Sequence, residues 1–313
     1  MSAIRVAVVN KSTRSNGEVR KVTEALRKQL RSDFGPAWSI DADIEFFEAR
    51  CRERAPGSEH ELLKTHVPIG WWWLVIQDGP RGAGDPNRSP EVSGLSLLDG
   101  GQRLPEHTRK LGLVLGEYQR SARGSAHHPV AATLGRHTVS ERGLPVAVVY
   151  ADVADAVFDG VPGVAGEVGG AWAGTASHEL LEMLANPWNN RAISHPGEGN
   201  VLAFYALEVC DPCQRPRYPI HGVNVAAFVR PSFFEPKPES KHSLAYGAEL
   251  TSPFTPQDGG FIGVYQVTSN RGWQLLTARG LVDRSNEPKP LHYGAPGTPV
   301  PGTEPDIESI VAP

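Results

Sequence analysis

The sequence predicts an α+β fold in which a mixed β-sheet packs over one central helix. Short apolar runs rich in valine, isoleucine and tryptophan recur in the first half of the chain, as they do in buried strands. Residues 175–187 combine the start, apolar and stop signals of a helix. The C-terminal part is rich in proline and glycine, so we expect irregular structure there.

The composition is typical of a protein with a sizeable core. The chain has 313 residues, of which 40% are hydrophobic and 21% are charged. From Ser285 onward prolines and glycines are frequent and apolar anchors are few, which is typical of a mobile tail. We therefore expect a single domain over residues 1–284 and a flexible tail over residues 285–313.

Charge and leader signals argue against several classes of function. The formal net charge is −4 and no dense Lys/Arg block is present, so we expect neither nucleic acid nor a membrane surface as a partner. The N-terminus has no secretory pattern, and no apolar run approaches the roughly 20 residues of a membrane span. A cytoplasmic location is the resulting expectation. Three cysteines are too few for a disulfide framework, and nothing in the sequence sets the oligomeric state.

The first half of the chain consists mainly of predicted strands, with one helix near its start. Apolar or alternating runs predict strands at 4–9, 40–47, 71–76 and 143–150, with a further short strand at 111–115. Ser15 and Glu18 have the spacing of a capping box, and Val19, Val22 and Leu26 recur after them at helical intervals. For the three tryptophans at 71–73, alternation favours core packing on both faces over stacking on a ligand.

Two central segments show no regular pattern. Residues 116–142 are polar, and we interpret His127, His128 and His137 as solvated loop residues, because no spacing fixes them on one face. Residues 160–170 are rich in glycine and lack the Lys-Ser/Thr ending of a phosphate loop. They predict a flexible approach to the helix that follows.

The segment that begins at Thr175 carries the strongest chemical signal. Thr175 or Ser177 can cap the start of a helix, and Asn186-Pro187 can end it. His178 and Glu182 are four residues apart, so both side chains lie on one helical face and can reach a single metal ion.

Glu179 lies next to that face, where it can take a proton from a metal-activated water. This arrangement predicts a metal-dependent hydrolase in which His178 and Glu182 hold the metal and Glu179 acts as the general base.

A third ligand is needed, because a catalytic metal usually takes three protein ligands. Residues 202–208 alternate like a strand, which places Glu208 in an apolar stretch where an unpaired carboxylate would be costly. Asp211 competes with Glu208, either as the third ligand or as an acceptor that orients His178 through its other ring nitrogen. We prefer Glu208, because Asp211 beside Pro212 has a ready role in a turn.

Cys210 and Cys213 form a Cys-x-x-Cys pair. A four-ligand zinc site would need another close pair, and Cys51 is alone. A thioredoxin-like site would need the pair to open a helix after a strand. We therefore interpret both cysteines as packed thiols. Farther along, a hairpin arm is expected at 220–229 and short strands at 261–267 and 273–276.

The predicted helix resembles a known active site. Thr175-Ala-Ser-His-Glu-Leu-Leu-Glu-Met-Leu-Ala-Asn-Pro187 is similar to the active-site helix of zincin metallopeptidases, in a His-Glu-x-x-Glu variant with Glu182 in place of the second histidine. The wider chain resembles an uncharacterised bacterial protein family in residues 6–13, 32–38, 72–76, 205–211 and 259–265.

The zincin resemblance implies a zincin-like mixed sheet over the helix, with the metal on His178 and Glu182, Glu179 as base, and Glu208 or Asp211 completing the shell. It also implies a bound Zn²⁺ and a peptide or small amide as substrate. The strand from Val146 to Tyr150 is then a candidate for pairing with an extended peptide.

The exchange of histidine for glutamate changes the charge of the site. One histidine and two carboxylates leave a zinc complex neutral, so water there is less acidified than with two histidines. A harder ion such as Mn²⁺ or Ca²⁺ is the alternative to zinc. The alternative to a hydrolase is a catalytically inactive binding or structural protein. In such a protein the metal would hold the helix to the Glu208 segment.

Overall fold

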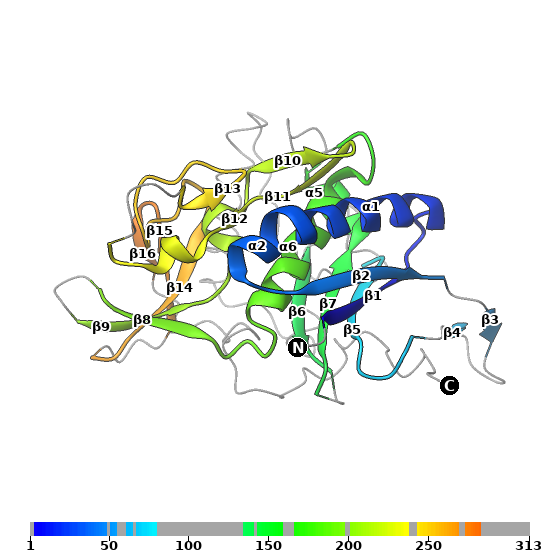
Figure 1. The fold of residues 1–313 in the computed structure, drawn as a ribbon, viewed down its shortest axis with the longest axis horizontal. Helices are drawn as coiled ribbons and strands as arrows, with labels where there is room; N and C mark the ends of the chain where they lie inside the picture. Colours follow the sequence, from blue (N-terminus) through cyan, green and yellow to red (C-terminus); the bar gives the residue numbers. More distant parts are fainter. Residues whose placement is uncertain are drawn as a thin grey trace, which may run out of the picture.

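The computed structural model describes residues 3–48, 51–54, 61–64, 67–79, 134–140, 143–158, 166–197, 201–237, 243–268 and 273–282. These residues form a mixed α+β structure with two five-stranded sheets and few helices (Figure 1). The strand expected at 111–115 and the tail expected from residue 285 lie outside the described residues, as does the domain boundary after residue 284.

The first sheet has the strand order β2-β1-β5-β7-β6. Its strands are β1 (Ile4–Lys11), β2 (Ala42–Phe47), β5 (Trp72–Gln77), β6 (Gly135–Val139) and β7 (Pro145–Tyr150). Strands β2, β1, β5 and β7 are parallel, whereas β6 runs antiparallel to β7. The sheet is therefore mixed, and among the described residues β2 and β6 form its two edges.

Helix α1 (Asn16–Gln29) connects β1 to β2 and starts as the sequence predicts. The Ser15 side chain accepts a hydrogen bond from the Glu18 amide at 3.1 Å. The reciprocal half of the capping box is absent, because the Glu18 carboxylate accepts a hydrogen bond from the Trp172 indole instead. The helix continues through a π-helical segment (Leu30–Phe34) into α2 (Gly35–Trp38), which ends at Ser39 in the left-handed conformation.

The two faces of the first sheet bury different side chains. Leu74 and Ile76 face one hydrophobic cluster, which also contains residues of α1 and of α6 (Gly170–Ala185). Trp73 and Val75 face the other cluster, together with Val153 of α5 (Ala151–Phe158). Trp72 packs against the first cluster while Trp73 is buried in the second, so the expected core role of these tryptophans is confirmed.

Helix α6 begins at Gly170, earlier than the start that the sequence indicates at Thr175 or Ser177. Its N-cap is Gly169, whose φ of 83° suits glycine. Because glycine has no side chain, the cap residue offers no side-chain acceptor to the free amides of the first turn. The Asp155 carboxylate on α5 accepts hydrogen bonds from the Ala171 and Trp172 amides at 2.8 and 3.0 Å. An anion from a neighbouring helix therefore caps α6, which a search for local Ser/Thr caps does not detect.

The two residues expected to cap α6 lie inside it. Thr175 and Ser177 are buried. The Ser177 hydroxyl donates to the Gln29 side chain on α1 at 2.7 Å and accepts from the Ala226 amide at 2.9 Å. The expected end of the helix is confirmed, because α6 stops at Ala185 with Asn186 as its C-cap.

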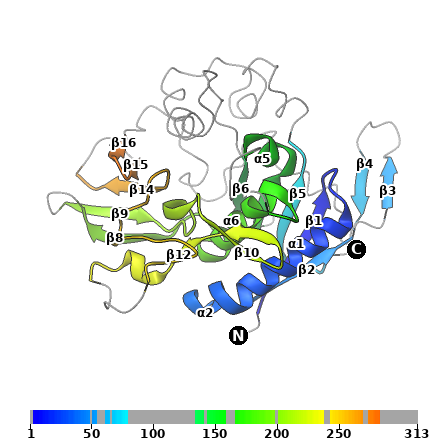
Figure 2. The ribbon, with the colours of Figure 1, turned by 90° about the horizontal axis from the view of Figure 1, so that it is seen from above.

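The second sheet is antiparallel, with the order β16-β15-β14-β9-β8. Its strands are β8 (Ala192–Pro196), β9 (Leu202–Ala206), β14 (Phe261–Gln266), β15 (Trp273–Thr277) and β16 (Gly280–Val282). Strand β9 ends two residues before Glu208, so the strand expected over 202–208 is shorter than predicted. Figures 1 and 2 show α6 between the first and second sheets.

Shorter elements complete the fold. They are β3 (Cys51–Arg54), β4 (Glu61–Lys64), a 3-10 turn (Asp211–Cys213), β10 (Arg217–Ile220), β11 (Val223–Ala226), β12 (Phe228–Val229), a second 3-10 turn (Pro231–Phe234) and β13 (Ala245–Tyr246). Strands β10 and β11 pair as a hairpin, so the arm expected over 220–229 is confirmed only for β11, and the turn of the hairpin lies within the expected arm. None of the helices in the described segments has the length and apolar character needed to cross a membrane.

Candidate metal centre

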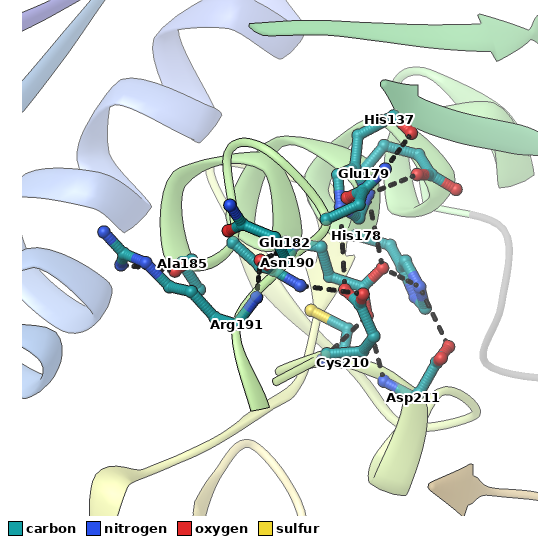
Figure 3. Close-up of polar contacts among 12 residues, drawn as sticks. His137, His178, Glu179, Glu182, Ala185, Asn190, Arg191, Cys210 and Asp211 are labelled. Atoms are coloured by element: carbon teal, nitrogen blue, oxygen red, sulfur yellow. Dashed lines mark hydrogen bonds and ion pairs between the residues drawn. The ribbon is translucent and has the colours of Figure 1, made fainter. Parts of the chain in front are cut away.

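Helix α6 presents His178 and Glu182 on one face, as their spacing predicts. His178 Nε2 lies 3.2 Å from Glu182 Oε2 and 3.4 Å from Asp211 Oδ1. Dashed lines in Figure 3 join Glu182 to His178 and His178 onward to Asp211. Asp211 therefore approaches the same ring nitrogen as Glu182. The alternative in which Asp211 orients His178 through the opposite nitrogen does not match this geometry.

The backbone of the turn after β9 fixes the carboxylate of Glu182. Its Oε1 accepts hydrogen bonds from the Cys210 and Asp211 amides, both at 3.2 Å. Burial alone would raise the pKa of Glu182, but the neighbouring His178 and these backbone donors hold it below its ordinary value. Glu182 is therefore ionised, and its Oε2 is turned toward the histidines.

Glu208 is buried, as expected for a carboxylate within an apolar stretch. Its residue exposure is 5%, and its Oε1 accepts a hydrogen bond from Asn186 Nδ2 at 3.1 Å. Its Oε2 is buried and has no hydrogen-bond partner among the described residues. Burial raises the pKa of Glu208 well above the ordinary value, although the charge of His137 opposes this.

The chain around Glu208 is held on both sides. The Leu207 amide donates to the Arg191 carbonyl at 3.1 Å, and the Val229 amide donates to the Val209 carbonyl at 2.7 Å. Asn186 Oδ1 accepts from the Asn190 and Arg191 amides at 3.0 and 2.9 Å. One amide side chain at the end of α6 therefore joins the helix terminus to the Glu208 carboxylate.

His137 is the residue that the sequence reasoning missed. It lies on strand β6, at an edge of the first sheet among the described residues, and is 1% exposed. Its interpretation as a solvated loop residue is therefore wrong. His137 Nδ1 lies 3.6 Å from Glu179 Oε2 and 3.9 Å from Glu182 Oε2, and Nε2 lies 3.6 Å from Glu208 Oε2. Burial alone would lower the pKa of His137, but the charges of these three carboxylates raise it to about 9.

A weak hairpin signal in the sequence could have placed His137. Thr138 and Val139 favour a strand, and Gly143 precedes the apolar run of β7. In the structure Gly143 has a φ of 74° and its amide bonds to the Ser140 carbonyl. Residues on both sides of such a turn pair as antiparallel strands.

Glu179 lies between α6 and β6. Its Oε2 is buried without a hydrogen-bond partner among the described residues, and its charge acts on His137, His178 and Asp211. Gly135 on β6 makes room for it, because a Cβ atom there would lie 2.7 Å from Glu179 Cγ. An ionised carboxylate in this position can accept a proton from a group bound beside the histidines.

The potential ligands divide into two groups that share Glu182. One group contains His178, Glu182 and Cys210, and the other contains His137, Glu182 and Glu208. In each group, one donor atom from every residue lies within 4.8 Å of the other two. Among the described residues neither Glu208 nor Asp211 forms such a group with His178 and Glu182. Glu208 comes together with His137, whereas the Asp211 carboxylate contacts His178, at 3.4 Å from Nε2.

Cys210 and Cys213 are buried free thiols, in agreement with the interpretation as packed residues. Burial first, and then the charge of Glu182, raise the pKa of Cys210 well above its ordinary value. Burial also raises the pKa of Cys213. Neither thiol therefore has the thiolate character of a redox cysteine.

Comparisons of the chain with protein-family models, with curated proteins and with solved structures found no match. The site geometry therefore stands by itself as evidence about function.

Proposed function

We propose that the protein is a metal-dependent hydrolase of the zincin-like type that cleaves a peptide or a related small amide. The observation that carries the proposal is the helix α6, on which His178 and Glu182 share a face and Glu179 lies beside it. Two carboxylates from the turn after β9, Glu208 and Asp211, approach the same region.

His178 and Glu182 are the residues that would hold the metal. Asp211 is the third candidate on this side, because it lies 3.4 Å from the same histidine nitrogen as Glu182. The chemistry that a divalent cation supplies at such a site is polarisation of a scissile carbonyl and acidification of water. With one histidine and two carboxylates as ligands, Zn²⁺ is the first candidate, and Mn²⁺ or Ca²⁺ is the alternative.

Glu179 would accept the proton of the attacking water and return it to the leaving amine. Its Oε2 makes no hydrogen bond among the described residues, and its contact with His137 Nδ1 is a long one of 3.6 Å, which leaves this oxygen able to accept a proton. Asp211 and His178 have side-chain exposures of 14% and 13%, which makes their end of the site the one that a substrate can reach.

A peptide substrate would pair with β6 rather than with the strand from Val146 to Tyr150. Strand β7, which contains those residues, is already paired with β5 and β6, so its backbone cannot accept a further strand. Strand β6 lies at an edge of the first sheet among the described residues and packs beside α6. Its backbone can therefore pair with an extended peptide. One position is already used, because the His137 carbonyl accepts a hydrogen bond from Asn189.

A catalytically inactive, metal-stabilised binding or structural protein is the second candidate. The burial of His137 and Glu208 favours it, because a metal held there would join β6, α6 and the turn after β9 without reaching solvent.

Glu179→Gln separates the two candidates. The variant keeps the size of the side chain and removes the proton acceptor, so we expect hydrolysis of a peptide library by the zinc-loaded protein to fall by about 10²-fold or more. Metal content and thermal stability should be retained. The control is Glu249→Gln, the same exchange at an exposed site. Equal cleavage by the two variants would show that Glu179 is not the general base. If the wild-type protein cleaves no peptide with any divalent ion, the hydrolase is excluded and the second candidate is supported.

A further inference from the structure

Glu182 is approached by histidines from two different elements. Its Oε2 lies 3.2 Å from His178 Nε2 on the same helix and 3.9 Å from His137 Nδ1 on β6. Both contacts are made by the same oxygen, and a carboxylate oxygen that lies between two imidazoles is placed to bridge two cations.

The inner group has the spacing of metal ligands. His137 Nε2 and Glu208 Oε2 are 3.6 Å apart. Two ligands that each lie about 2.1 Å from a zinc ion are roughly 3.4 Å apart in a tetrahedral shell. Glu208 Oε2 is also buried without a hydrogen-bond partner among the described residues, and it points at His137. A buried carboxylate oxygen left in this state is costly unless a cation compensates it.

The charge of the whole cluster favours a second cation. Glu179, Glu182, Glu208 and Asp211 together carry four negative charges when ionised, and all are largely buried. One divalent ion on neutral histidines balances half of this charge, and two divalent ions balance all of it. Because uncompensated buried charge is strongly unfavourable, the cluster suits two ions better than one.

We propose that the site binds two divalent cations that share Glu182, an outer ion at His178 and Asp211 and an inner ion at His137 and Glu208. This inference rests on the proposed function, to which it adds the inner ion. The outer ligands have side-chain exposures of 13% and 14%, whereas the inner ligands have 1% and 6%. The outer ion is therefore accessible to substrate. The inner ion is shielded from solvent and connects β6 to α6 and to the turn after β9.

The test is the metal content of the full chain after loading with zinc sulfate and desalting, measured by inductively coupled plasma mass spectrometry. We expect about two zinc ions per chain in the wild-type protein and about one in each of His137→Gln, Glu208→Gln and His178→Ala, because each variant removes a ligand of one ion. Glu182→Gln should lose both ions. His221→Asn, which changes an exposed histidine in the β10–β11 turn, is the control and should keep the wild-type content.

A second measurement keeps the result independent of folding defects. Circular dichroism of the metal-free variants identifies any that are unfolded, and Glu208→Gln replaces His137→Gln if the latter does not fold. If the wild-type protein binds about one zinc ion and His137→Gln and Glu208→Gln retain it, the inner ion is excluded and the proposed function is unaffected. The absence of zinc from the loaded wild-type protein would overturn both.

Discussion

His137 Nε2 on strand β6 lies 3.6 Å from Glu208 Oε2 in the turn after strand β9. His137 belongs to the first sheet and Glu208 follows a strand of the second sheet, and helix α6, which carries Glu182, lies between the two sheets. Because of this pair, the candidate metal centre contains residues from an edge strand and a turn as well as from helix α6. Any test of the site must therefore address the helix, the edge strand and the turn separately.

The ligands on α6 can be tested singly. We expect His178→Ala and Glu182→Ala each to lower the zinc content by about one ion per chain or more, because each variant removes a donor from a group that needs three. The measurement is metal analysis after equilibrium dialysis. Either variant with the full wild-type content would exclude that residue from the shell.

The third ligand of the outer group can be distinguished by substitution and spectroscopy. Burial raises the pKa of Cys210 well above its ordinary value in the metal-free protein, so its thiol must lose a proton to bind a metal, while Asp211 lies 3.4 Å from His178. We expect Asp211→Asn to weaken metal binding and Cys210→Ser to leave it unchanged. The cobalt-loaded protein should show no thiolate-to-metal absorption band. A band that disappears in Cys210→Ser would reassign the ligand to the cysteine.

Gly135 is predicted to be essential for the position of Glu179. A Cβ atom at Gly135 would lie 2.7 Å from Glu179 Cγ and 3.0 Å from Thr175 Cγ2. We expect Gly135→Ala to lower the free energy of unfolding by about 1–3 kcal/mol through overpacking. Gly17→Ala on α1, where the added Cβ would lie 3.9 Å from Ser15 Oγ, is the matched control and should not destabilise the protein. Equal denaturation midpoints for the two variants would contradict the close contact.

Asn186 links the end of α6 to Glu208, and its loss should affect both stability and metal binding. We expect Asn186→Ala to lower the free energy of unfolding by about 2 kcal/mol, because two backbone amides and a buried carboxylate lose their partner. Metal affinity should fall by about 10- to 100-fold, as it does when groups that orient ligands are removed. Asn190→Ala keeps its backbone amide and serves as the control in isothermal titration. A variant with weakened folding and unchanged affinity would limit Asn186 to the helix cap.

The stability of the metal-free protein should fall as the pH rises. Burial first, and then Glu182, raise the pKa of Asp211 from 3.8 to about 7, and the pKa of His137 rises from 6.5 to about 9. Both groups hold protons more tightly in the folded state than in the unfolded state, so the stability they add is present at low pH. It is lost between pH 3.8 and about 7 for Asp211 and between 6.5 and about 9 for His137.

Metal should reverse this dependence, because the ligands must lose their protons to bind and affinity therefore rises with pH. Chemical denaturation at pH 5, 7 and 9, with a chelator and with zinc, measures both trends. A chelated protein that gains stability between pH 7 and 9 would contradict the raised pKa of His137.

Local pattern in the sequence determined the four parallel strands of the first sheet, the α1 helix and the ligand face of α6, but not the edge strand β6. Periodicity is a local property, so the spacing of His178 and Glu182 was sufficient to place both on one side of a helix. The burial of Glu208 followed from its apolar neighbours.

Only the tertiary structure decided the start of α6, the role of His137 and the pairing of ligands. The cap of α6 comes from Asp155 on another helix, and such a cap leaves no signal beside the helix that it caps. His137 acquires its carboxylate neighbours because β6 returns antiparallel beside β7 and brings a polar segment against α6. Glu208 and Asp211 lie three residues apart, but the backbone turn between them directs one toward His137 and the other toward His178. That division depends on the path of the backbone in space, which spacing along the chain does not specify.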